Sequence, residues 1–228
     1  MRVSFMGILF LTNCTNQKWP DELYNKGEIR REMRNRYGFS EIPGCDVRGN
    51  FPSQRDPPFV APAKEMYRGS FSSSLKPFAE RLSDADLCFI SAGYIFVRGI
   101  DLIYYYDCRL SGKGGKRKRL ASELTDEVKE KFRRRVSDGS YGTILIVLSG
   151  IYFETLLGDH PTFLHIINEE SRGELPQVFV AGKRSKLVEI KSINEDLDLD
   201  VSTFRRKGFA PLTNAQKQGI LDEIEQRN

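Results

Sequence analysis

The chain contains no apolar run of the roughly 20 residues that a membrane helix needs. The longest candidate, Val3 to Thr12, is about half that length. Although Arg2 precedes it, the polar segment 13–18 behind it is a poor signal-peptide cleavage site. We therefore interpret Val3 to Leu11 as a strand buried on both faces, and expect no membrane partner.

Cysteine and histidine are also scarce. The four cysteines form no Cys-x-x-Cys pair, and only two histidines accompany them. This spacing does not suit a four-ligand zinc site or a disulfide scaffold. We expect no metal, no cofactor and a reducing cytoplasmic compartment. The residues concerned are Cys14, Cys45, Cys88, Cys108, His160 and His165.

The 228 residues nevertheless include enough apolar material for a core, because 39% are hydrophobic and 29% are charged. This composition excludes a disordered or fibrous chain. The sequence shows no repeat and no linker, so we expect a single domain over residues 1–228. Within it, residues 19–60 look like a long loop-rich insertion and residues 111–119 like a basic loop.

Positive charge is clustered, although 35 Lys and Arg against 31 Asp and Glu leave a net charge of only +4. Any single cluster is explained by a solvated helix face. Five clusters together favour a basic surface for a polyanion, and nucleic acid in particular. The clusters lie near residues 30–36, 113–119, 131–135, 183–186 and 205–207.

Apolar segments alternate with amphipathic ones along the chain. This alternation predicts an α/β fold with a central, largely parallel sheet flanked by helices. Besides the first strand, the expected strands are Asp86 to Ser91, Thr143 to Leu148 and Gln177 to Val180. The expected helices are Arg30 to Tyr37, Ser72 to Leu82, Ser122 to Val136 with Ser122 as its cap, one opening at Tyr152 to Leu157, and Asn214 to Gln226.

Ligands of such sheets bind beyond the carboxyl ends of the strands. The first of three segments selected by this rule is 13–18, a run rich in amides. Asn13, Asn16 and Gln17 are suited to hold a water or to read a base edge, whereas an Asx turn or a helix cap explains only one or two of them. Cys14 has no histidine in a matching segment to activate it, so we interpret it as a small packing residue.

The other two segments, 91–96 and 149–152, supply aromatic side chains. Tyr94 and Tyr152 directly follow strands and are candidates to stack on an extruded base, although most aromatic residues belong to a core. Asp107 follows three tyrosines. It is a candidate general base or stabiliser of positive charge on a sugar, and equally a turn residue or an ion-pair partner of Arg98 or Arg109.

The Gly- and Lys-rich loop 111–119 does not have the spacing of a phosphate-binding P-loop. As a flexible basic arm it suits contacts to a phosphate backbone, and it is equally compatible with a localisation signal. The expected DNA-backbone contacts are Arg98, Lys113, Lys116, Arg117, Lys118 and Arg119.

Several motifs resemble known families. CTNQK at 14–18 resembles the C-[ST]-x-x-K opening of a bacterial and phage family of uncharacterised domains. The order and content of PAKEMYRGSF (62–71), FISAGYIFVRGIDLIYYYDCRL (89–110) and TILIVLSGIYFETL (143–156) resemble the YaaA peroxide-stress family. The matched segments span residues 8–156, about two thirds of the chain.

The wider resemblance is to the uracil-DNA-glycosylase-like superfamily. It implies a parallel sheet, DNA binding, base flipping and cleavage of the N-glycosidic bond. By position, Asn13 or Asn16 orients the water and Asp107 stabilises charge on the sugar. Tyr94 or Phe96 stacks on the base, and Ser149 and Tyr152 hold the sugar-phosphate. Together with the residues near the same sheet edge, the expected base- and substrate-binding residues are Gln17, Lys18, Ser91, Tyr94, Phe96, Tyr106, Ser149 and Tyr152.

The resulting hypothesis is a monomeric, monofunctional DNA glycosylase without a metal. Its substrate would be double-stranded phage DNA with a hypermodified base such as glucosylated hydroxymethylcytosine, and its role antiphage defence. One alternative is a non-enzymatic DNA-binding stress protein of the YaaA type. Another is a glycosidase or transferase acting on free nucleotides.

Overall fold

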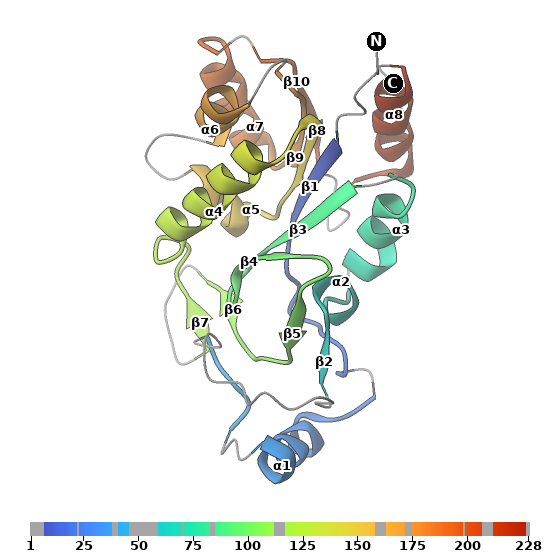
Figure 1. Ribbon diagram of the computed structural model, residues 1–228, viewed down its shortest axis with the longest axis vertical. Helices are drawn as coiled ribbons and strands as arrows, with labels where there is room; N and C mark the ends of the chain where they lie inside the picture. The colour runs from blue at the N-terminus through green and yellow to red at the C-terminus, as the bar shows by residue number, and fades with distance from the viewer. Residues whose placement is uncertain are drawn as a thin grey trace.

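A central sheet with helices on both faces dominates the computed structural model of the protein (Figure 1). This arrangement confirms the α/β class expected from the alternation of apolar and amphipathic segments. The structure describes residues 7–21, 23–37, 41–45, 59–69, 71–82, 85–111, 117–157, 163–171, 175–197, 199–206 and 212–226.

The central sheet has six strands in the order β10-β9-β8-β1-β3-β4. All neighbours are parallel except β4, which runs antiparallel to β3. The strands are β1 (Gly7–Asn13), β3 (Ala85–Ser91), β4 (Ile95–Arg98), β8 (Tyr141–Val147), β9 (Gln177–Gly182) and β10 (Val201–Arg205).

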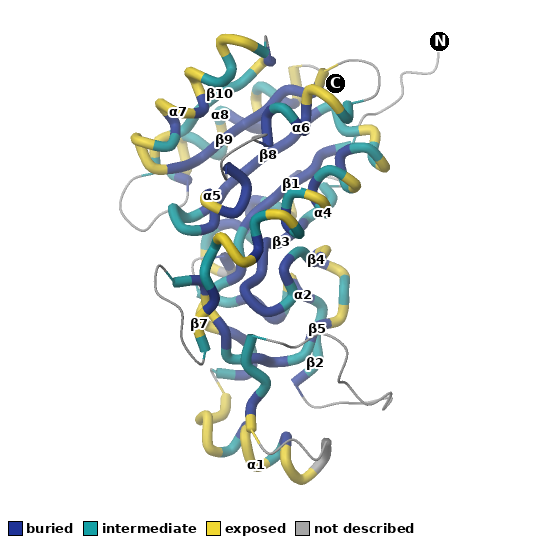
Figure 2. The backbone as a smooth tube through the Cα atoms, turned by 90° about the vertical axis from the view of Figure 1, so that its left-hand side faces the viewer, coloured by how far each residue is buried: buried dark blue, intermediate teal, exposed yellow. Residues whose placement is uncertain are grey.

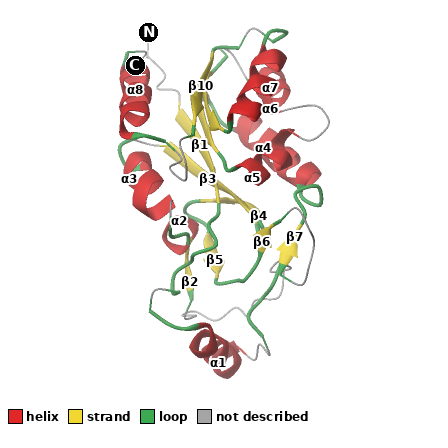
Figure 3. Ribbon diagram, turned by 180° about the vertical axis from the view of Figure 1, so that it is seen from behind, coloured by secondary structure: helices red, strands yellow, loops and turns green. Residues whose placement is uncertain are grey.

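Helices cover the two faces of this sheet unequally. In Figures 1 and 3, α3 (Lys76–Ala79) and α8 (Asn214–Glu225) lie on one side, and a larger group of helices lies on the other. Because helices cover both faces of the sheet, β8 and β9 are almost completely buried (Figure 2). Their sequences are accordingly mostly apolar. The larger group consists of α4 (Thr125–Asp138), α5 (Gly150–Leu157), α6 (Phe163–Glu170) and α7 (Arg184–Asn194).

Smaller elements extend the molecule beyond the carboxyl end of β1. Two short ribbons lie there, with α1 (Lys26–Tyr37) at the far end (Figures 1 and 3). One ribbon pairs β2 (Val60–Pro62) with β5 (Leu102–Tyr104), and the other pairs β6 (Arg109–Leu110) with β7 (Lys118–Arg119). Between β2 and α3 the chain forms a short helix α2 (Ala63–Met66) and a π-helical turn η1 (Phe71–Leu75).

Several expected boundaries are wrong. Helix α4 begins at Thr125 rather than Ser122, its N-cap is Leu124, and no side chain caps it. The expected helix Ser72 to Leu82 is instead the π-helical turn η1 followed by α3, and Pro77 lies in the first turn of α3. Residues 3–6 of the expected first strand lie outside the described part of the chain.

Strand β10 and helices α6 and α7 were not predicted. In β10 and α7, polar residues interrupt the apolar ones. Conversely, α1 begins one turn earlier than the expected Arg30. Across the described residues, no helix is both long and apolar enough to cross a membrane.

Candidate functional site

The carboxyl ends of three parallel strands meet at one edge of the sheet. Residue Asn13 pairs with Ile90 at the end of β3, and Thr12 pairs with Val147 at the end of β8. From β1 the chain continues to β3 and β4 on one side, and from β8 to β9 and β10 on the other. The strand order therefore reverses between β1 and β8, the position where ligands of open α/β sheets bind.

Asn13 joins the two strands at this reversal point. Its Oδ1 accepts a hydrogen bond from the backbone N–H of Ser149 at 2.8 Å, and its Nδ2 donates to the carbonyl of Cys14 at 2.9 Å. The oxygen and the nitrogen of the Asn13 amide thus both bind backbone groups, at Ser149 and at Cys14. The structure gives Asn13 a positioning role, in contrast to the water-holding role expected of it.

A cavity of about 500 Å³ lies beyond this edge. Its wall is strongly basic, because five cationic side chains and only one carboxylate line it. The lining residues are Asn16, Lys18, Lys26, Asp107, Cys108, Arg109, Arg117 and Lys118.

Local structure brings these cations together from distant parts of the sequence. Asn25 caps α1, since its Oδ1 accepts from the N–H groups of Gly27 and Glu28 at 2.9 and 3.0 Å. This cap starts the helix one residue later, at Lys26. Elsewhere in the lining, the β6–β7 pairing places Arg109 directly beside Lys118.

Asp107 is held between two of the cations. Its Oδ2 accepts hydrogen bonds from Lys26 Nζ at 3.0 Å and from Arg117 Nη1 at 2.7 Å. Burial alone would raise the pKa of the Asp107 carboxyl, but these hydrogen bonds and charges outweigh it and lower the pKa below its usual value. Asp107 is therefore a carboxylate at neutral pH, and it pairs with Lys26 and Arg117 rather than with Arg98 or Arg109.

Lys18 lines the same cavity, although it is only 2% exposed. Its backbone is fixed on both sides: Lys18 N–H donates to Asp21 Oδ2 at 3.0 Å, and Lys18 forms an antiparallel bridge with Tyr67. Its Nζ lies 4.3 Å from the centre of the Tyr106 ring, and no carboxylate of the described residues lies within 4 Å of it. Burial lowers the pKa of this ammonium group.

Three hydroxyl groups form a closed triangle beneath Lys18. The Oγ of Ser91 lies 3.0 Å from the Tyr67 hydroxyl and 2.8 Å from the Tyr106 hydroxyl, and the two tyrosine oxygens are 3.1 Å apart. All three residues are fully buried, and burial raises the pKa of both tyrosines. Ser91 and Tyr106 are thus internal supports of the site rather than direct substrate contacts.

The aromatic residues expected to stack on a base belong to the core or pack against it. Tyr152 is 6% exposed, and its hydroxyl lies 3.0 Å from Cys14 Sγ. Tyr94 packs edge-on against Tyr106 at 5.4 Å, and its hydroxyl accepts from the Tyr104 N–H at 2.8 Å. Phe96 packs against the core from β4. None of Tyr94, Phe96 and Tyr152 lines the cavity.

The basic residues of loop 111–119 lie in different environments. Arg117 and Lys118 line the cavity, whereas Arg119 is 8% exposed and its Nη1 donates to the carbonyl of Ala92 at 3.1 Å. Arg98 pairs with Asp101 at the other edge of the sheet, away from the cavity. Arg119 and Arg98 therefore do not share a DNA-backbone surface with Arg117. Lys113 and Lys116 lie outside the described residues.

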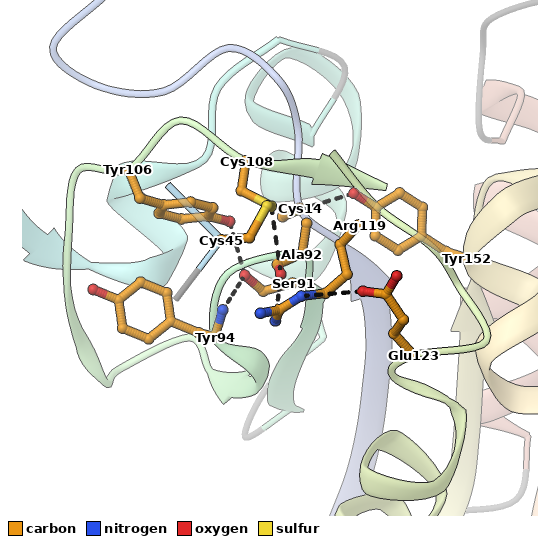
Figure 4. Close-up of a disulfide and its surroundings, with 10 residues drawn as sticks. All are labelled: Cys14, Cys45, Ser91, Ala92, Tyr94, Tyr106, Cys108, Arg119, Glu123 and Tyr152. Carbon is orange, nitrogen blue, oxygen red and sulfur yellow. Dashed lines mark hydrogen bonds and ion pairs between the residues drawn. A yellow bond between two sulfur atoms is a disulfide. The ribbon is translucent and has the colours of Figure 1, made fainter. Parts of the chain in front are cut away.

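A disulfide closes one wall of the site. Cys45 is bonded to Cys108, with their Cα atoms 4.9 Å apart, whereas Cys14 and Cys88 are free and buried (Figure 4). The cysteine spacing did not predict this single disulfide. The bond ties segment 41–45 to Asp107, whose N–H donates to the carbonyl of Pro43 at 2.8 Å.

Of the remaining expected residues, Asn16 is exposed and lines the cavity. Gln17 is exposed outside it, and its backbone carbonyl accepts from the Arg68 N–H at 3.0 Å. Ser149 contributes its backbone: its carbonyl accepts from the N–H of Tyr152 and so helps to start α5.

Two cavity cations, Lys26 and Arg109, were missed as binding residues. Asn25 followed by Glu28 is a capping pattern that would have placed Lys26 at a helix start, but residues 19–60 showed no clear periodicity around it. Nothing in the sequence places Arg109 beside Lys118. Among the described residues, no cluster of three or more histidine, cysteine or acidic side chains is arranged to hold a metal ion.

No protein-family model matches this chain. No curated protein and no solved structure matches it either.

Proposed function

We propose that the protein is a DNA glycosylase that accepts an extruded, modified nucleotide in the basic cavity and cleaves its N-glycosidic bond. The single observation that carries this proposal is the composition and place of the cavity. Five cations and one fixed carboxylate line a cavity of about 500 Å³ that lies beyond the carboxyl end of β1. Cavities of a few hundred Å³ and more are of a size to hold a small ligand.

The charge distribution supports a ligand with phosphate groups. Arg109 and Lys118 form no ion pair with another described residue, so their charges are available to a ligand. A nucleotide that leaves a duplex has a phosphate on each side, and both would meet this basic wall. The uracil-DNA-glycosylase-like architecture and the role in antiphage defence remain part of this proposal.

Asp107 would supply the electrostatic contribution to bond cleavage. Its carboxylate is fixed by two cations and is ionised at neutral pH, so it is suited to stabilise positive charge that develops on the sugar. One such preorganised group commonly contributes a factor of roughly a hundred or more in rate. Because the aromatic candidates are buried elsewhere, the base would be recognised by polar groups such as the amide of Asn16 rather than by stacking.

Incubation with three matched duplexes tests the proposal: unmodified DNA, uracil-containing DNA and phage DNA with hypermodified cytosine. Alkali-labile breaks confined to one of them would establish base excision and name the substrate class. A mobility shift without breaks in any duplex would instead establish a DNA-binding protein that performs no excision. Release of a base from free nucleotides alone would indicate the nucleotide-level activity.

A further inference from the structure

We propose that Lys18 is an amine nucleophile that forms a covalent imine with C1′ of the deoxyribose. This inference rests on the proposed function, because it adds to DNA base excision a residue that attacks the sugar. It also changes the expected reaction class: a glycosylase with such an amine retains a covalent bond to the abasic sugar, whereas a monofunctional one adds water.

The position of Lys18 carries the argument. Lys18 is almost fully buried and is also one of the residues that line the cavity, so its amine would be reached from the cavity rather than from bulk water. The other cavity lysines, Lys26 and Lys118, are exposed. Lys26 is moreover engaged by Asp107 at 3.0 Å, whereas no carboxylate of the described part of the chain pairs with the Lys18 ammonium.

The surroundings favour a neutral amine before reaction and a cation afterwards. Burial lowers the pKa of Lys18, which increases the fraction of nucleophilic free amine. The face of the Tyr106 ring lies 4.3 Å from Nζ, and an aromatic face attracts a cation. The iminium ion would therefore be stabilised by a ring that the hydroxyl triangle with Ser91 and Tyr67 holds in place.

The proposed reaction replaces the bond from C1′ to the base with a bond from C1′ to Lys18 Nζ. The lone pair of Lys18 Nζ forms a bond to C1′ while the bond from C1′ to the base nitrogen breaks, and that electron pair leaves with the base, which takes up a proton. Nζ then loses a proton, the C1′–O4′ bond breaks, O4′ is protonated, and the nitrogen lone pair completes the iminium bond. With a pre-formed abasic aldehyde, the amine instead adds to the carbonyl carbon and water leaves.

Borohydride trapping on a pre-formed abasic duplex tests the inference without knowledge of the modified base. Borohydride delivers hydride to the iminium carbon and fixes the cross-link. We expect a cross-linked species with the wild-type protein and at least a tenfold lower yield with Lys18→Met. Lys131→Arg, a change to a lysine of α4 that pairs with Glu127 outside the cavity, should give the wild-type yield.

Mapping of the adduct in the wild-type protein by mass spectrometry makes the test independent of how well a variant folds. The inference is correct if the reduced deoxyribose remnant is on Lys18. It is overturned if the wild-type protein gives no cross-link, if the remnant maps to another amine, or if Lys18→Met retains the yield within twofold. Base release is scored separately on the modified duplex, so excision without trapping removes only the role of Lys18, whereas absence of excision removes the proposed function.

Discussion

The side chain of Asn13 accepts a hydrogen bond from the backbone N–H of Ser149, 136 positions further along the chain. This contact joins the carboxyl ends of β1 and β8 at the rim of the candidate site. A polar residue that looks catalytic in sequence thus connects the two central strands.

Substitution of this amide should lower stability. Asn13→Ala leaves the Ser149 N–H without its partner, and we expect the free energy of unfolding to fall by about 1–2 kcal/mol. Denaturant unfolding monitored by circular dichroism measures the change. Asn16→Ala, an exposed amide only three residues away, should stay within about 0.5 kcal/mol of the wild type. Equal stability of Asn13→Ala and the wild type would contradict the bridging role.

The disulfide predicts a thiol count. Denatured, unreduced protein should react with two equivalents of an alkylating reagent, at Cys14 and Cys88, and reduced protein with four. Since Cys45 and Cys108 are separated by 63 residues, we expect Cys45→Ala to destabilise the protein by roughly 2–4 kcal/mol. Four reactive thiols without reductant would show that the bond does not form.

Asp107→Asn separates binding from chemistry. We expect base release under single-turnover conditions to slow by roughly a hundredfold, because a neutral amide does not stabilise a sugar cation. Affinity for the duplex should not weaken, since the change removes a negative charge, that of the one carboxylate among the described residues that line the cavity. Asp101→Asn, the same change at an aspartate paired with Arg98 outside the cavity, should leave the rate unchanged. Full activity of Asp107→Asn would disprove the assignment.

The exposed cavity cations predict how salt affects DNA binding. Arg109→Gln and Lys118→Gln should each reduce the slope of log K against log salt by about 1, because each removes one phosphate contact. Fluorescence anisotropy with a labelled duplex between 50 and 200 mM salt, the range over which about 10³-fold losses are typical, gives the slopes. As a matched control, Arg81→Gln alters an exposed arginine that donates to Gln218 and lies in none of the basic clusters, and its slope should equal that of the wild type.

Lys18 predicts a dependence of stability on pH. The pKa of Lys18 is lower in the folded protein than in the unfolded chain, so the unfolded chain binds this proton more tightly. The free energy of unfolding therefore decreases as the pH falls from the ordinary lysine pKa toward the pKa of Lys18 in the folded protein. Cys14, Asp21, Asp107 and Lys26 influence the same group. Lys18→Met should therefore be more stable than the wild type by about 1 kcal/mol near neutral pH, a gain typical of replaced functional residues.

The difference in stability between Lys18→Met and the wild type should shrink as the pH approaches the ordinary lysine pKa of about 10.4. Thermal denaturation of both proteins across the pH range measures it. Lys131→Met serves as the control, because its ammonium is partly exposed and pairs with Glu127 on the same helix. A difference that stays constant with pH would show that the Lys18 ammonium carries no burial penalty.

The sequence alone determined the class of fold and the edge of the sheet at which segment 13–18 lies. The apolar runs that became β1, β3 and β8 are visible without a structure, because strands covered on both faces must be hydrophobic throughout. Parallel strands bring their carboxyl ends to one edge. Segment 13–18 was therefore correctly expected to lie at that edge together with the segments that follow β3 and β8.

Only the tertiary structure decided which side chains enter the cavity. The sequence cannot distinguish Tyr94 and Tyr152, which pack into the core, from aromatic residues that face a ligand, because both environments favour large rings. Likewise, Cys45 and Cys108 come together only because the loops that carry them cross in space. The burial of Lys18 follows from its bridge to Tyr67, a contact between segments almost 50 residues apart, and such long-range contacts leave no local signal in the sequence.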